Sequence, residues 1–122
     1  MDTKFGYLLS DWDKAKEEMR DVLIEVAKNK GQISYSDLVA RVKTISLTPE
    51  AYALNAMLEE ICREEVEQGR GMLTVVVVHK SVDKDPGKGF FDLAKEFGFY
   101  TSKLGCFAEQ SNNVYDYWNK FK

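Results

Sequence analysis

The fold is decided by the stretch Met72–Phe90, which reads MLTVVVVHKSVDKDPGKGF. Its first part, Leu73–Val78, is short, almost entirely apolar and rich in β-branched residues, a pattern that favours a strand covered on both faces. Its second part, Ser81–Gly89, contains the turn signal Asp85-Pro86-Gly87. We therefore expect one buried strand that leads into a Gly-rich surface loop.

Two helices are predicted upstream of this strand from apolar periodicity. Residues 11–30 carry an apolar stripe at three- and four-residue steps, with Ser10 as the N-cap and Gly31 as the stop. Residues 32–34 form a short extended link. Ser34 is then expected to cap a second helix, Tyr35–Lys43.

A third helix is predicted to begin at Thr48-Pro49-Glu50, because a capping hydroxyl, a proline and an early acid are typical of a helix start. It is expected to run to about Gln68 and to end at Gly69 or Gly71.

Shorter helical segments are expected after the loop. Phe90–Phe97 reads as one or two helical turns that stop at Gly98. Leu104–Ser111 is ambiguous between helix and irregular structure. Apolar side chains from Val114 to Phe121 suggest a final short helix that packs back on the body of the protein.

This order of elements is that of a winged helix-turn-helix within the α+β class. It has three N-terminal helices, a small antiparallel sheet and C-terminal helices, with the Met72–Phe90 region as strand and wing. The competing architecture is a generic α+β domain with a two- or three-stranded sheet. The chain of 122 residues shows no linker long enough to divide it, so residues 1–122 are taken as one domain.

Composition limits the function classes. The net charge of −3 argues against general nucleic-acid binding, which depends on neutralising phosphates, although a local basic surface is still compatible with it. Cys62 and Cys106 lie outside any CxxC or Cys/His cluster and are expected to be unpaired thiols, which fits a reducing compartment. No secretory leader or run of about 20 apolar residues is present, so a cytoplasmic location without membrane contact is expected. We expect no cofactor and no metal site.

The Gly-rich loop is the main candidate site. Backbone N–H groups at Gly87 and Gly89 could hold a phosphate or another anion, with lysines nearby. Its spacing matches neither a Walker A motif nor a dinucleotide fingerprint, and the alternative is an ordinary charged turn. If the protein binds nucleic acid, the expected contacts are the basic residues of this loop and of the end of the second helix: Arg41, Lys43, Lys80, Lys84 and Lys88.

The third helix is a poor candidate for reading DNA. Between Pro49 and Gln68 it carries six acidic residues and one basic residue, Arg63. Phosphates lining a groove would repel such a helix. We interpret these carboxylates as a solvated acidic face.

His79 is the only histidine, so every catalytic hypothesis must use it. Asp83 or Asp85 could pair with it, and Tyr35 and Asp37 could approach it from the second helix. A small hydrolase built on His79 is the least favoured alternative, and no catalytic residue is assigned.

Aromatic residues crowd the last third of the chain. Those of the final helix cannot all lie on one helical face, which predicts a surface for self-association or protein binding. The residues concerned are Tyr115, Tyr117, Trp118 and Phe121.

The run Leu73–Lys80, followed by Pro86-Gly87-Lys88-Gly89-Phe90-Phe91-Asp92-Leu93-Ala94, resembles a small family of bacterial domains. The family pattern is a hydrophobic strand ending in Lys, then Pro-Gly-x-Gly-Phe and a short Leu-Ala helix. The resemblance covers about Gly31–Gly98, and it implies the winged-helix-like fold more than an activity.

A second resemblance lies in Gly31–Val39, which is similar to the opening of the DNA-binding domain in alkylguanine-DNA alkyltransferases and their alkyltransferase-like relatives. Val78 stands where that family has its nucleophilic cysteine, so no alkyl group can be accepted. No arginine opens the third helix to replace a flipped base. The resemblance implies a shared winged-helix layout.

Together these patterns predict a domain that acts by binding rather than catalysis. The expected partner is DNA, contacted through the wing-like loop. The alternative is another protein or a second copy of the chain, bound through the C-terminal aromatic residues.

Overall fold

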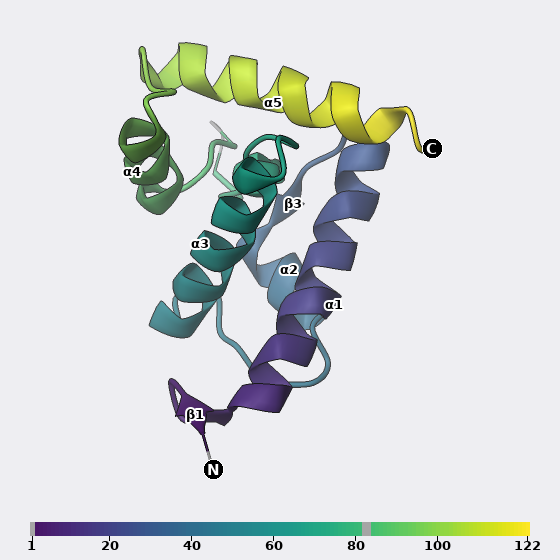
Figure 1. The fold of residues 1–122 in the computed structure, drawn as a ribbon, viewed down its shortest axis with the longest axis vertical. Coiled ribbons are helices and arrows are strands. Elements are labelled where there is room, and N and C mark those ends of the chain that lie inside the picture. The colour runs from purple at the N-terminus through teal and green to yellow at the C-terminus, as the bar shows by residue number, and fades with distance from the viewer. Residues whose placement is uncertain (1, 82–83) are drawn as a thin grey trace.

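The computed structural model, which describes residues 2–81 and 84–122, has an α+β architecture in which helices predominate. Figure 1 shows the long helices α1 (Leu9–Lys28) and α3 (Tyr52–Glu67) with α5 (Lys103–Asn119) crossing one end of the pair. The Tyr115 hydroxyl donates to the carbonyl of Gly31 at 2.7 Å, and the Asn119 amide donates to that of Lys28 at 2.7 Å. These bonds join the end of α5 to the end of α1.

The predicted apolar stripe of α1 forms the centre of the core. Its fully buried residues are Trp12, Ala15, Met19, Leu23 and Ala27. The predicted N-cap at Ser10 is wrong, because the helix begins at Leu9 and its N-cap, Leu8, makes no side-chain bond. The preceding chain already ends in a hairpin, β1 (Thr3–Lys4) with β2 (Tyr7–Leu8), which leads directly into the helix.

The end of α1 also differs from the expected stop at Gly31. Lys30 takes the left-handed conformation, at φ 52°. The N–H of Gly31 donates to the carbonyl of Val26 and that of Lys30 to Ala27, which is the Schellman arrangement. Lys30 therefore occupies the position that glycine usually fills.

The predicted cap of the second helix is confirmed. The Ser34 hydroxyl accepts from the backbone N–H of Asp37 at 3.1 Å and starts α2 (Tyr35–Ala40). This helix ends before the predicted Lys43. The segment beyond it is attached to α1 instead, because the Glu18 carboxylate accepts from the N–H groups of Lys43 and Thr44.

The predicted start of the third helix at Thr48 is wrong. Residues 48–51 form a turn, closed by the Ala51 N–H and the Thr48 carbonyl at 3.1 Å, and α3 starts at Tyr52. Nearby Ile45 and Leu47 are buried, so the core holds this segment in place before the helix begins. At the other end, Gly69 takes φ +73° directly after the C-cap Gln68, as one of the two predicted stops.

The predicted strand Leu73–Val78 is wrong over most of its length. Leu73–Val76 form a 3-10 helix, η1, and only β4 (Val77–Val78) is extended. A short apolar run cannot by itself distinguish a strand from a buried helical turn. The segment packs against α1, α3 and α5, which bury its apolar side chains.

The sheets are small and differ from the expected one. β4 pairs in parallel with β3 (Ile33–Ser34), in the register Ile33 with Val77 and Ser34 with Val78. The antiparallel pair is the N-terminal hairpin of β1 and β2. The α+β class is thus confirmed, and the winged-helix layout stays a prediction.

The C-terminal region is more helical than expected. The helix α4 (Lys88–Phe97) begins two residues before the predicted Phe90 and ends at Gly98 as predicted, at φ +80°. The ambiguous segment and the predicted final helix form one helix, α5, whose N-cap Ser102 accepts from the N–H of Gly105. Both cysteines, Cys62 and Cys106, are free thiols, as predicted, and both are buried.

Candidate functional site

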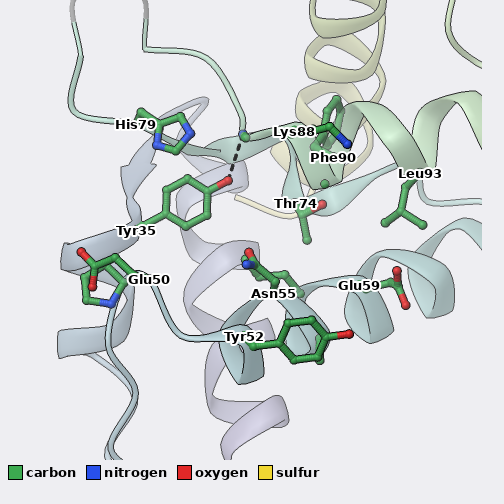
Figure 2. A pocket seen from close by; sticks show the side chains of 15 residues that line it. Tyr35, Glu50, Tyr52, Asn55, Glu59, Thr74, His79, Lys88, Phe90 and Leu93 are labelled. Atoms are coloured by element: carbon green, nitrogen blue, oxygen red, sulfur yellow. Dashed lines mark hydrogen bonds between the residues drawn. The ribbon is translucent and has the colours of Figure 1, made fainter.

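A pocket of about 560 Å³ lies between α3, α4, the start of α2 and the end of β4. Figure 2 shows two facing walls: Tyr35, His79 and Lys88 on one side, and Tyr52, Asn55 and Glu59 of α3 on the other. This volume is in the range of small-molecule sites, and a pocket with a few convergent polar groups is the usual form of such a site.

Strand pairing brings Tyr35 and His79 together. Ser34 and Val78 are partners in the parallel pairing of β3 with β4. The residues that follow them, Tyr35 and His79, therefore lie side by side. The two rings have centroids 4.9 Å apart and planes tilted by 31°. The expectation that Tyr35 approaches His79 is confirmed, whereas Asp37 is paired with Lys80 at 3.8 Å instead.

The predicted Gly87 is held against this ring pair. Its backbone N–H donates to the Tyr35 hydroxyl at 3.0 Å. A Cβ added at this position would lie 2.8 Å from the Tyr35 oxygen and 3.3 Å from Nε2 of His79. Since Gly87 has φ −73°, glycine is required here by close approach and not by backbone conformation.

The O–H of Tyr35 is available to donate a hydrogen bond to a ligand. Burial raises the pKa of this hydroxyl above its usual value, although the N–H of Gly87 acts in the opposite direction. The group is therefore neutral near pH 7, and it accepts from Gly87 while its own O–H has no acceptor among the described residues. A hydroxyl that already accepts a hydrogen bond is a stronger donor.

The α4 N-terminus completes this wall. Gly87 is its N-cap, and the N–H of Phe90 already donates to the carbonyl of Gly87. The N–H groups of Lys88 and Gly89 have no partner within the helix, since the first N–H groups of any helix lack one. They lie at the positive end of the helix dipole. The predicted anion-binding residues Gly87 and Gly89 thus border the pocket.

The α3 wall was not predicted. Tyr52, Asn55 and Glu59 share one face of α3 because they are three and four residues apart. Tyr52 is 76% exposed although it is large and partly apolar. Glu50 lies at the Tyr35 end of the pocket and Glu59 at the Leu93 end (Figure 2). Polar periodicity on the face opposite the apolar stripe is the only sequence signal for this wall.

The predicted basic residues are only partly available. Lys88 is paired with Asp92 at 2.8 Å and Lys80 with Asp37 at 3.8 Å. Nζ of Lys43 donates to the carbonyl of Ala40 at 2.8 Å, at the end of α2. Arg41 and Lys84 are exposed. Nucleic-acid binding through Arg41, Lys43, Lys80, Lys84 and Lys88 stays a prediction.

The groups that a His79 hydrolase needs are engaged elsewhere. The Asp85 carboxylate pairs with Lys103 at 2.9 Å. The hydrogen bond and charge of Lys103 lower the pKa of this carboxyl. Asp85 meets His79 through the backbone, as its carbonyl accepts from the His79 N–H at 3.0 Å. Asp83 lies outside the described residues.

The prediction that the carboxylates of α3 form a solvated face is wrong for three of them. These are Glu60, Glu64 and the completely buried Glu65, which form ion pairs with cations of α1 and with Arg70, three residues after the end of α3. We name this cluster the charged seam; its members are Lys16, Arg20, Glu60, Glu64, Glu65 and Arg70. The Arg70 guanidinium donates to both oxygens of Glu65, at 2.8 and 2.6 Å, and Arg20 donates to one of them at 2.6 Å.

The C-terminal aromatic residues are packed on one another at the end of α5. Tyr117 and Trp118 meet edge to face with centroids 4.9 Å apart, and Phe121 contacts both. Phe121 is 54% exposed, and Tyr117 and Trp118 are partly buried. Self-association or protein binding through this cluster stays a prediction.

Within residues 2–81 and 84–122, no group of three His, Cys, Asp or Glu side chains is placed to hold a metal ion. None of the helices described is both long and apolar enough to span a bilayer. No family model matches the chain, and no curated protein and no solved structure is significantly similar to it.

Proposed function

We propose that the protein is a binding module whose pocket takes a small ligand with an anionic group, held between Tyr35 and the first turn of α4. The observation that supports this most is the close approach at Gly87. There the Gly-rich turn, the Tyr35 hydroxyl and the free N–H groups of Lys88 and Gly89 border the same pocket.

The anion would accept hydrogen bonds from three donors of neutral groups. Two are the backbone N–H groups of Lys88 and Gly89, and the third is the Tyr35 O–H. Such donors, fixed by a helix start and a buried ring, stabilise an anion without reorganisation. The Lys88 ammonium adds positive charge at the rim, although Asp92 shares it. Binding by this arrangement does not depend on a strongly basic surface.

Binding is favoured over catalysis because, among the described residues, no carboxylate is hydrogen-bonded to the ring of the single histidine. The Asp85 side chain, the nearest predicted partner, is paired with Lys103. His79 instead supports the face of the Tyr35 ring. Its role in this proposal is to position Tyr35.

The proposal is tested by thermal unfolding in about 50 mM phosphate and in chloride at about equal ionic strength, for the wild type, Gly87→Ala and Gly31→Ala. A ligand that binds only the folded state raises the melting temperature. Phosphate also stabilises proteins without a site, and this general effect is common to all three proteins. Gly31 is the matched control, because it lies outside the pocket and an added Cβ there makes only ordinary contacts with Val26, at 3.5 and 3.7 Å.

We expect an extra stabilisation by phosphate in the wild type and in Gly31→Ala that is lost in Gly87→Ala. An equal response of all three proteins would overturn the proposal, because it would leave only the general effect.

A further inference from the structure

We infer that the ligand of this pocket is a nucleoside 5′-monophosphate. This inference rests on the proposed function and names its ligand class. It is based on the chemical difference between the two walls of the cavity, and not on the helix start alone. One wall offers donors to an anion, while the facing wall offers acceptors, an amide and an exposed aromatic ring.

A ligand that is only an anion would leave the acidic wall of the pocket unused. Glu50 and Glu59 add two carboxylates to the lining, against the single ammonium of Lys88. A ligand that fills about 560 Å³ must therefore bring hydrogen-bond donors to α3 as well as negative charge to α4. The hydroxyl groups of a ribose are such donors, and carboxylates are their usual acceptors in nucleotide sites.

The aromatic ring of Tyr52 offers a stacking surface for the base, the third part of the nucleotide. It is 76% exposed, lines the pocket, and packs against Phe5 with ring centroids 5.4 Å apart. Nucleobases stack on exposed aromatic side chains of this kind. The amide of Asn55, one helical turn further along the same face, can both donate to and accept from a base edge.

A peptide C-terminus is the competing ligand, because its carboxylate would suit the same donors. The apolar lining from Leu58, Phe90 and Leu93 could receive a side chain. The nucleotide is favoured because its ribose hydroxyls and base would contact the two carboxylates and the exposed Tyr52 ring, whereas an apolar side chain would use neither.

The test is calorimetric titration of the whole chain with AMP, ribose 5-phosphate, adenosine and inorganic phosphate. The variants are Tyr52→Leu and, as a control at a distant exposed ring, Phe121→Leu. We expect AMP to bind at least tenfold more tightly than ribose 5-phosphate, which is the order of one base stacked on an aromatic ring. Tyr52→Leu should abolish this difference without changing the affinity for ribose 5-phosphate. Phe121→Leu should change neither.

The outcomes separate the two proposals. If AMP binds no more tightly than inorganic phosphate, the nucleotide inference fails and the proposed anion site stands. If adenosine binds as tightly as AMP, the phosphate is not recognised, and both fail. If none of the four compounds binds, both fail as well. An unchanged preference for AMP in Tyr52→Leu would overturn the assignment of the base to Tyr52.

Discussion

The charged seam and the pocket both place ionisable or polar side chains beside α3, on different faces, and they use them in opposite ways. In the seam, Glu65 is completely buried and accepts hydrogen bonds from two arginines. In the pocket, Tyr52 is exposed and the Tyr35 O–H has no acceptor among the described residues. Paired groups hold helices together, whereas groups without partners remain available to a ligand.

This difference separates stability from function within one helix. A buried charge without a partner costs several kcal/mol, so the completely buried Glu65 depends on its cations. A polar group at the pocket rim is solvated and can be replaced with little loss of stability. Substitutions in the seam should therefore act on folding, and substitutions in the pocket on binding.

The largest effect is expected at Glu65. Glu65→Ala leaves Arg20 and Arg70 without their shared carboxylate, and the free energy of unfolding should fall by about 3 kcal/mol. Glu50→Ala, in the pocket, should change it by about 0.5 kcal/mol or less. Urea denaturation measures both. Equal losses for the two variants would contradict the division between seam and pocket.

A smaller effect is expected at acid pH. Burial acts to raise the pKa of Glu64, but hydrogen bonds and charges from Lys16 and Arg20 outweigh it and lower this pKa below 4.5. Burial also acts to raise the pKa of Glu60, but hydrogen bonds from Lys4, Trp12 and Lys16 outweigh it and lower this pKa. Because both folded values are depressed, their stabilisation is complete above about pH 4.5 and is lost as the pH falls through the folded values.

Lys16→Met tests this assignment, because Lys16 is shared by both carboxylates and methionine preserves the apolar stem. Unfolding free energies measured from pH 7 to pH 3 should fall less steeply in the variant than in the wild type. The same slope in both proteins would show that Lys16 does not stabilise the two carboxylates.

The smallest effect is expected from the glycine pair. Gly89→Ala should raise the free energy of unfolding by about 0.5–1 kcal/mol, because alanine favours the first turn of α4 and the site is open. Gly87→Ala should lower it by about 1 kcal/mol, because its Cβ crowds Tyr35 and His79. Thermal unfolding in chloride measures these changes. A stabilising Gly87→Ala would contradict the close approach on which the site depends.

The features that could be predicted correctly from the sequence are encoded locally. The Ser34 cap and the Gly98 stop depend on residues within one helical turn, and both are confirmed. The Gly-rich loop could be identified as the candidate site because its glycines and lysines are also close together in the sequence. By contrast, Leu73–Val76 could not be assigned from its composition, because only its helical neighbours make a 3-10 turn preferable to a strand.

Long-range features were beyond such reasoning. Glu65 looks like one more carboxylate in an acidic helix until Arg20 and Arg70, 45 and 5 residues away, are placed around it. The contribution of Tyr52 and Asn55 to the site depends on α4 packing opposite α3, which no local pattern encodes. The approach of Tyr35 to His79 was anticipated as a contact from the second helix, but the pairing of β3 with β4 that brings the two residues together was not.

The central claim is that the anion binds inside the pocket and not on the exposed basic residues. Amide NMR spectra recorded during titration of the wild type with inorganic phosphate test this most directly. We expect saturable shifts centred on Gly87, Lys88 and Gly89, a response of Tyr35, and no shifts in the charged seam. Shifts confined to Arg41, Lys43 and Lys80, or spread without saturation over all exposed lysines, would contradict it.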